Sequence, residues 1–174
     1  SLDKNALENL MRTLRDTTET MIRLVNALLE VSRIEARTIV LRREPIDLGS
    51  ATQKILQDFE TYARAANISM RVHIPPSTPL VIGDLDRISM VIQNLIDNAV
   101  RYTRGSGNIE IKIEATDSRV LWSIEDEGVG IPIDQQRYIF KIFFRAGNAK
   151  TQEVRGSGVG LYIAKAMIEA SGGK

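Results

Sequence analysis

The sequence predicts an α+β fold, a two-layer α/β sandwich with a mixed sheet and helices on one face, preceded by a long coiled-coil or bundle helix. Three observations predict it. An apolar heptad pattern runs through the first thirty or so residues. Later segments alternate apolar and polar residues as half-buried strands do. Glycine-rich turns separate these strands from segments with helical periodicity.

Composition excludes several classes of protein. The 174 residues are 43% hydrophobic and 26% charged, which is typical of a globular chain able to bury a core. A net charge of +1 supplies no field for nucleic acid, and the absence of cysteine excludes disulfides and thiolate metal sites. No apolar run reaches the length of a membrane span, and no signal peptide is present. We therefore expect a cytoplasmic domain, with any membrane anchor in segments outside this chain.

Residues 1–37 are expected to form a helix that packs against a partner. Its apolar seam occupies two heptad positions, Leu7, Leu14, Met21 and Leu28 in one and Leu10, Thr17, Leu24 and Val31 in the other. An isolated helix would leave this seam in water, so the pattern favours a homodimeric helical bundle. A helix packed into the chain's own core is the alternative. Residues 38–47 are typical of a linker.

Residues 48–174 are predicted to form the α/β layer. A helix begins at Asp47 or Ser50, either of which could cap it. The alternation from 68 to 74 predicts a strand, and 84–102 a helix. Residues 108–116 and 119–126 resemble a β-hairpin. The polar segment 133–155 is long enough for a lid over a site, and a last helix covers about 159–170.

The helix within 84–102 carries amide side chains beside its apolar face. Asn94, Asn98 and Arg101 fall within an arc of roughly 60° at about 100° per residue. An asparagine carbonyl is a neutral ligand suited to Mg²⁺, and an arginine can face phosphate. Two solvated asparagines at a helix edge are an equally good reading of this pattern alone.

Two glycine-bearing turns follow. In "DEGVGIP", Asp126 leaves a strand and could accept a hydrogen bond from an exocyclic amine, while Gly128 and Gly130 permit close approach of a flat ring. In "RGSGVGLYIAK", glycines precede a helix whose free N–H groups could bind an anion. That spacing fits neither a Walker loop nor a dinucleotide-binding fingerprint. Each turn by itself is a weak signal.

Together, in this order, the three elements resemble the ATP-binding domain of sensor histidine kinases, within the Bergerat-fold (GHKL) ATPases that include gyrase B and MutL-type proteins. "YIFKIFFR" matches the family's phenylalanine box, and "LLEVSRIEA" with "REPIDL" is similar to the end of its dimerisation helix and its linker. The resemblance covers about residues 21–174. It implies a protein-histidine kinase of two-component signal transduction that uses ATP and Mg²⁺, with a response regulator as partner.

The resemblance also implies roles for individual residues. Asn98 stands at the position of the Mg²⁺ ligand, and Asn94, Asn98 and Arg101 form the expected catalytic set. Phe140 and Phe143 would anchor the lid. The residues expected to bind the nucleotide are Asn94, Asn98, Arg101, Tyr102, Asp126, Gly128, Gly130, Ile131, Lys150, Arg155, Gly156, Ser157, Gly158, Val159, Gly160 and Leu161.

The pattern departs from the family in two places. The family's acceptor histidine lies on a bundle helix, whereas the one histidine here, His73, falls on the polar face of a predicted strand. We expect that the chain starts after the acceptor helix, which makes residues 1–37 the second bundle helix. The family usually continues past the position of Lys174 with a β-hairpin, so we expect the catalytic domain here to lack that hairpin. A GHKL-type ATPase or serine kinase, or a catalytically silent dimerising scaffold, remains an alternative function.

Overall fold

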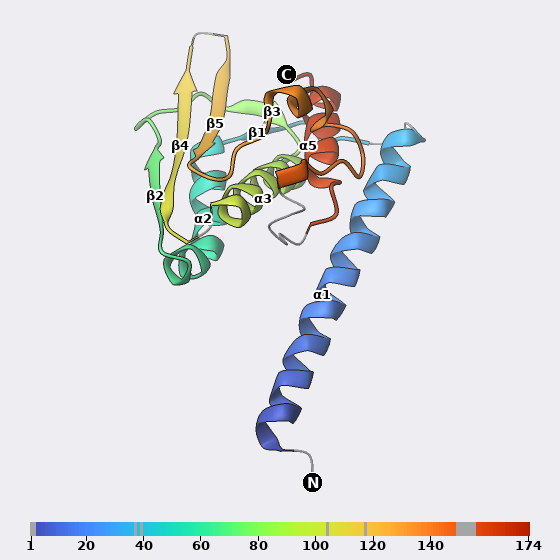
Figure 1. Cartoon of the computed structure of the whole chain (residues 1–174). Helices are drawn as coiled ribbons and strands as arrows, with labels where there is room; N and C mark the ends of the chain where they lie inside the picture. The colour runs from blue at the N-terminus through green and yellow to red at the C-terminus, as the bar shows by residue number, and fades with distance from the viewer. Residues whose placement is uncertain (1–2, 37, 39, 104, 117, 149–155) are drawn as a thin grey trace. The chain divides into compact units, whose positions relative to one another are not determined.

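The computed structural model describes residues 3–36, 38, 40–103, 105–116, 118–148 and 156–174. The chain divides into two compact units, Ser1–Ile39 and Val40–Lys174. Figure 1 shows a single long helix in the first and a sheet with helices in the second. Each unit is described by itself.

The first unit is the helix α1, Lys4–Glu35. Its six apolar seam residues from Leu7 to Leu28 are each between 37% and 61% exposed. Threonines inside the helix return their hydroxyls to the backbone, since Thr13 and Thr17 donate to the carbonyls of Asn9 and Thr13. The predicted helix is therefore confirmed, while its pairing in a coiled coil stays a prediction.

The second unit contains two small sheets. Strand β2 (Ile68–His73) runs parallel to β4 (Gly107–Ala115), which pairs antiparallel with β5 (Val120–Asp126). The mixed sheet and the hairpin are thus as predicted. Strand β1 (Glu44–Ile46) pairs antiparallel with β3 (Val81–Gly83). The sequence predicted neither, and β1 lies inside the segment expected as a linker.

The described residues of the second unit also form the helices α2 (Leu48–Ala65), α3 (Leu85–Tyr102) and α5 (Gly160–Ala170) and the 3-10 helix η1 (Ile133–Tyr138). Figure 1 shows α2 and α3 on one face of the β2–β4–β5 sheet, and α5 packs against α3. The core between these layers is formed by Ile55, Leu56, Ile68, Ile92, Ile96, Ile109 and Ile111, among others. Burying these aliphatic side chains is the main force that fixes α3 over the sheet.

Aspartates close the N-termini of two helices. Asp47 accepts a hydrogen bond from the N–H of Ser50 at the start of α2, which selects Asp47 over Ser50 as the cap. Asp84 accepts from the N–H of Arg87 at the start of α3 and from the N–H of Arg42. The contact with Arg42 holds the pKa of Asp84 below its usual value of 3.8.

A tryptophan ties the hairpin to α2. Trp122 Nε1 donates to Thr52 Oγ1 at 3.0 Å, and the fully buried hydroxyl of Thr52 donates to the carbonyl of Leu48 at 2.7 Å. Trp122 is the chain's single tryptophan. Its environment therefore reports on the packing of the sheet against α2.

The other face of the sheet is polar. His73 Nε2 lies 3.1 Å from Glu110 Oε1, and Lys112 Nζ lies 2.6 Å from Glu110 Oε2. The hydrogen bond from Lys112 holds the pKa of Glu110 below its usual value. His73 is therefore an exposed strand residue in a charged cluster, as its alternation predicts. Within the described residues, no helix is both long and apolar enough to cross a membrane.

Candidate functional site

Strand register places Asp126 on the helix-covered face of the sheet. Asp126 is the last residue of β5 and pairs with the buried Ile109 of β4, whose side chain points toward α3. Because side chains alternate along a strand, Asp126 lies on that same face, at the edge where the strand ends. Its Oδ1 accepts a hydrogen bond from the N–H of Gly128 at 2.9 Å, and the carboxylate is exposed.

The turn after β5 lies against the C-terminal end of α3. The N–H of Val129 donates to the carbonyl of Tyr102 at 3.3 Å. A Cβ at Gly128 would lie 2.6 Å from that carbonyl oxygen and 2.5 Å from Asp126 Oδ1, so only glycine fits there. Gly130 has φ +64 with open space around its Cα, a conformation that favours glycine. The turn at residues 126–132, which was predicted to bind adenine, thus contacts α3, the helix that carries Asn94 and Asn98.

The second glycine-bearing turn, residues 156–160, also lies against α3. A Cβ at Gly160 would lie 3.2 Å from Asn94 Oδ1, and one at Gly156 would lie 3.9 Å from Tyr102 Oη. Asn98 sits one helical turn from each of these two α3 residues and is half-buried. The structure therefore brings Asn94, Asn98 and Tyr102 together with both turns.

Helix α5 begins without a side-chain cap. Val159 occupies the cap position, makes no capping hydrogen bond, and is 1% exposed. The N–H groups of a first helical turn have no partners within their own helix, and the positive end of the helix dipole lies there. Such an end, opened by glycines, is suited to an anion.

The segment before the second glycine turn forms the 3-10 helix Ile133–Tyr138 and a phenylalanine-bearing loop. Phe143 has φ +62, an outlying conformation for so bulky a residue, and is 58% exposed. Gly158, with φ +70, packs on it so closely that a Cβ would lie 2.7 Å from the carbonyl oxygen of Phe144 and 2.8 Å from the carbonyl carbon of Phe143. The two segments are therefore fitted to one another through their backbones.

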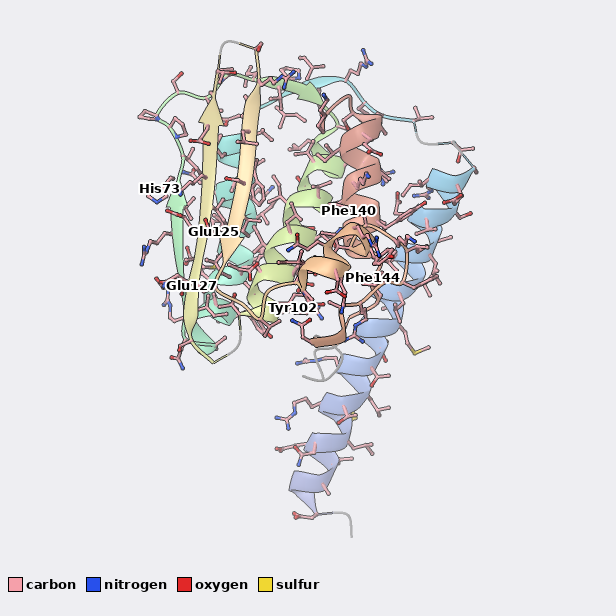
Figure 2. The ribbon with its side chains drawn as sticks, turned by 45° about the horizontal axis from the view of Figure 1, so that its top comes forward. His73, Tyr102, Glu125, Glu127, Phe140 and Phe144 are labelled. Carbon is pink, nitrogen blue, oxygen red and sulfur yellow. The ribbon has the colours of Figure 1, made fainter. Side chains whose placement is uncertain are left out.

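Figure 2 shows Tyr102, Phe140 and Phe144 on the helical side of the second unit, whereas His73 and Glu125 lie on the sheet. Phe140 is 44% exposed, with Lys165 Nζ 5.2 Å from its ring centroid. The rings of Tyr138 and Phe144 lie 5.8 Å apart. The phenylalanine box thus forms a partly exposed aromatic group next to the second glycine turn.

Other predicted site residues are placed less directly. Arg101 is paired on its own helix, with Nε 2.7 Å from Asp97 Oδ2. Ile131 is 40% exposed, and Ser157 and Leu161 are half-buried. Lys150 and Arg155 lie outside the described residues.

Sequence reasoning missed two residues that hold the first glycine turn. Gln136 Nε2 donates to the carbonyl of Ile131 at 3.2 Å. Asn148 Nδ2 donates to the carbonyls of Val129 and Gly130 at 3.1 and 3.0 Å. Both lie in the irregular segment 133–155, where no periodicity indicates which side chains turn inward.

The comparisons with known proteins agree with this geometry. Residues 83–174 match the family described as histidine kinase-, DNA gyrase B- and HSP90-like ATPases, which is more than half of the chain. The sensor protein kinase WalK of Staphylococcus epidermidis is 34% identical over 174 residues. That alignment covers 99% of this chain and 28% of WalK, so the chain spans just over a quarter of this relative.

Solved structures of similar fold are also histidine kinases. The Acinetobacter baumannii histidine kinase AdeS matches with a TM-score of 0.75 at 28% identity, over 98% of this chain and 75% of that one. Full-length ShkA, in complex with AMPPNP, matches with a TM-score of 0.81 at 25% identity, over 99% and 35%. ThkA, in complex with the response regulator protein TrrA, matches with a TM-score of 0.76 at 26% identity, over 98% and 46%. The chain therefore belongs to the family of histidine kinase-, DNA gyrase B- and HSP90-like ATPases, as a catalytic region of the sensor histidine kinase type.

Proposed function

We propose that this chain binds Mg·ATP and presents its γ-phosphate to a histidine on a bundle helix, as the kinase region of a two-component sensor. The observation that carries the proposal is that both glycine-bearing turns lie along the C-terminal half of α3, Gly160 beside Asn94 and Gly128 beside the carbonyl of Tyr102. The complex of the similar ShkA with AMPPNP supports nucleotide binding by this chain.

The adenine end of the site depends on Asp126. One of its carboxylate oxygens already accepts the N–H of Gly128, which leaves the other oxygen to accept the exocyclic amine of adenine. The glycines at 128 and 130 carry no side chains to block a flat ring. Asp126 therefore reads the base while its own hydrogen bond keeps the carboxylate in place.

The phosphate end depends on α3 and α5. The first turn of α5, which has no side-chain cap, would offer its N–H groups to the phosphates. Asn94 Oδ1 lies 3.2 Å from a Cβ built on Gly160 of α5, and Asn98 follows one turn later on α3, where its amide oxygen would complete the set. These neutral oxygens fit Mg²⁺, which would share them with phosphate oxygens and neutralise part of the phosphate charge. Arg101, Lys150 and Arg155 are the cations that we assign to the phosphates.

Two partners follow from the family and from α1. The complex of the similar ThkA with a response regulator supports a response regulator as the partner of this chain. The exposed apolar seam of α1 supports a homodimer formed through that helix, because four heptads of such side chains are rarely left in water. The domain acts in the cytoplasm, with any membrane anchor outside this chain.

Replacing Asp126 with asparagine tests the site. Asparagine replaces one carboxylate oxygen with an NH2 donor, so while its carbonyl oxygen keeps the bond from Gly128, its NH2 faces the amine of adenine, donor against donor. We therefore expect about 10-fold weaker binding of a fluorescent ATP analogue. Fluorescence titration measures this.

Glu125→Gln is the matched control for that variant. It removes the same charge from the opposite face of the same strand and should bind like the parent. Equal affinities of the parent and Asp126→Asn would refute the assignment of Asp126.

Replacing Leu14 and Met21 with lysine tests the homodimer. Two charges in the seam should shift the chain from dimer to monomer in sedimentation velocity, without altering nucleotide affinity. A parent chain that is monomeric at every concentration would contradict dimerisation through α1.

A further inference from the structure

The turn Gly128–Ile131 is held by residues on both of its sides. Toward α3, the N–H of Val129 donates to the carbonyl of Tyr102. The N–H of Gly128 donates to the carboxylate of Asp126, at the end of β5. Toward the segment 133–148, the carbonyls of Val129 and Gly130 both accept from Asn148 Nδ2. Gly130 sits at φ +64 with nothing within 4 Å of a built Cβ, so packing at the Cβ position does not hold this residue and the hydrogen bond that its carbonyl accepts from Asn148 does.

We infer that Asn148 is a positioning residue for nucleotide binding, acting by holding the carbonyls of Val129 and Gly130 in the conformation that opens the turn to the base. This inference rests on the proposed function, because it assumes that the turn receives adenine. Asn148 itself need not touch the nucleotide.

The chemistry of the side chain is specific. One amide nitrogen carries two hydrogens, so it can donate to two carbonyls at once. Aspartate has the same shape but no donor when ionised, and its oxygens would repel both carbonyls. Alanine removes the donor without adding a charge. Neither change touches the core, since Asn148 is only half-buried.

A second hydrogen bond within the segment 133–148 provides the control. The N–H of Gly147 donates to Gln135 Oε1 at 2.9 Å, which fastens the segment to the 3-10 helix and not to the turn. If Asn148 acts only by keeping the segment ordered, then Gln135→Ala should have the same effect. If Asn148 acts on the turn, Gln135→Ala should be nearly silent.

The experiment compares the parent, Asn148→Ala, Asn148→Asp and Gln135→Ala by titration with a fluorescent ATP analogue and Mg²⁺. We expect both Asn148 variants to bind at least 5-fold more weakly, and Gln135→Ala to stay within 2-fold of the parent. Without nucleotide, thermal unfolding followed through Trp122 should be nearly the same in all four. Hydrogen exchange of the peptide that contains residues 127–132 should be faster in Asn148→Ala and unchanged in Gln135→Ala.

Each other outcome overturns the inference. Parent-like affinity in Asn148→Ala would show that the tie is dispensable, and weakening by Asn148→Asp alone would reduce it to a charge effect. Equal weakening by Gln135→Ala would assign the effect to the order of the segment. A parent that fails to bind the analogue would instead remove the proposed function, together with this inference.

Discussion

The helices α3 and α5 both begin with a turn of backbone N–H groups, but only the N-terminus of α3 has a side-chain cap. At α3, the carboxylate of Asp84 accepts from the N–H of Arg87 within the first turn and from the N–H of Arg42 before β1. At α5, the cap position is held by the buried Val159, which offers no acceptor, and glycines precede it. The start of α3 is capped by a side chain of its own chain, whereas the start of α5 has no side-chain cap.

The cap at the start of α3 stabilises the fold, whereas we propose that the start of α5 binds a ligand. Closing the end of α3 satisfies an N–H group and joins the β1–β3 sheet to the helix, which stabilises the fold. Leaving the end of α5 without a cap forgoes that stabilisation. The same N–H groups then remain available for phosphate, whose negative charge interacts favourably with the helix dipole. The comparison predicts that changes at α5 reduce nucleotide binding and changes at α3 reduce stability.

The largest effect is expected from Gly158→Ala. The alanine would need φ +70, and its Cβ would lie 2.7 Å from the carbonyl oxygen of Phe144, so the turn before α5 must move. We expect the nucleotide affinity of the folded protein to fall by 10-fold or more, together with a loss of stability, because alanine is strained at a positive φ and the adjacent Val159 is buried. Isothermal titration calorimetry with ATP and Mg²⁺ measures the affinity.

Gly172→Ala at the other end of α5 is the control. Gly172 also has a positive φ, +83, but has nothing within 4 Å of a built Cβ. It should lower stability slightly and leave affinity unchanged. If both variants bind ATP as the parent does, the turn before α5 does not shape a phosphate site.

A smaller effect, on stability, is expected from Asp84→Ala. The substitution removes a helix cap and leaves the N–H of Arg42 without that acceptor, which should lower the free energy of unfolding by roughly 2 kcal/mol. Urea unfolding followed by Trp122 fluorescence measures it. Nucleotide affinity of the folded protein should not change. A large loss of affinity at unchanged stability would reverse the roles that we assign to the two helix ends.

The smallest effect is the pH dependence of that cap. Because the pKa of Asp84 is held below 3.8 in the folded chain, its contribution to stability is complete above the unfolded pKa and is lost as pH falls through the folded value. The stability gap between the parent and Asp84→Ala should therefore be largest near pH 6 and narrow below about pH 4. A gap that is constant down to pH 2.5 in denaturant titrations would show that the charge of Asp84 contributes nothing.

Regular elements could be predicted where their patterns were long. Helix α3 and the strands β4 and β5 contain full periods of apolar residues, so period alone locates them within a residue or two. Strands β1 and β3 are three residues each, too short for any period, and they exist because each pairs with the other. The prediction of a linker over residues 38–47 missed β1 for this reason.

The candidate site divides in the same way. Asn98, Asp126 and the glycines could be named because residue type and order are properties of the chain. Asn148 and Gln136 could not, because their relevance comes from carbonyls that they reach only in the folded chain, 18 and 19 residues away for Asn148 and five residues away for Gln136. Arg101 pairs with Asp97 on the same helix, which is a local contact. In the proposed function this ion pair competes with a contact between Arg101 and phosphate, and the sequence alone does not indicate that competition.

The sequence by itself determined which residues have the chemistry for a nucleotide, and which segments are helices and strands, because side-chain type and apolar period are encoded locally. Tertiary structure alone decided that Gly128 lies on the carbonyl of Tyr102, that Gly160 lies beside Asn94, and that Asn148 spans two carbonyls. The physical reason is that burial of the isoleucine-rich core fixes α3 over the sheet, and only then are distant turns brought alongside the C-terminal half of that helix.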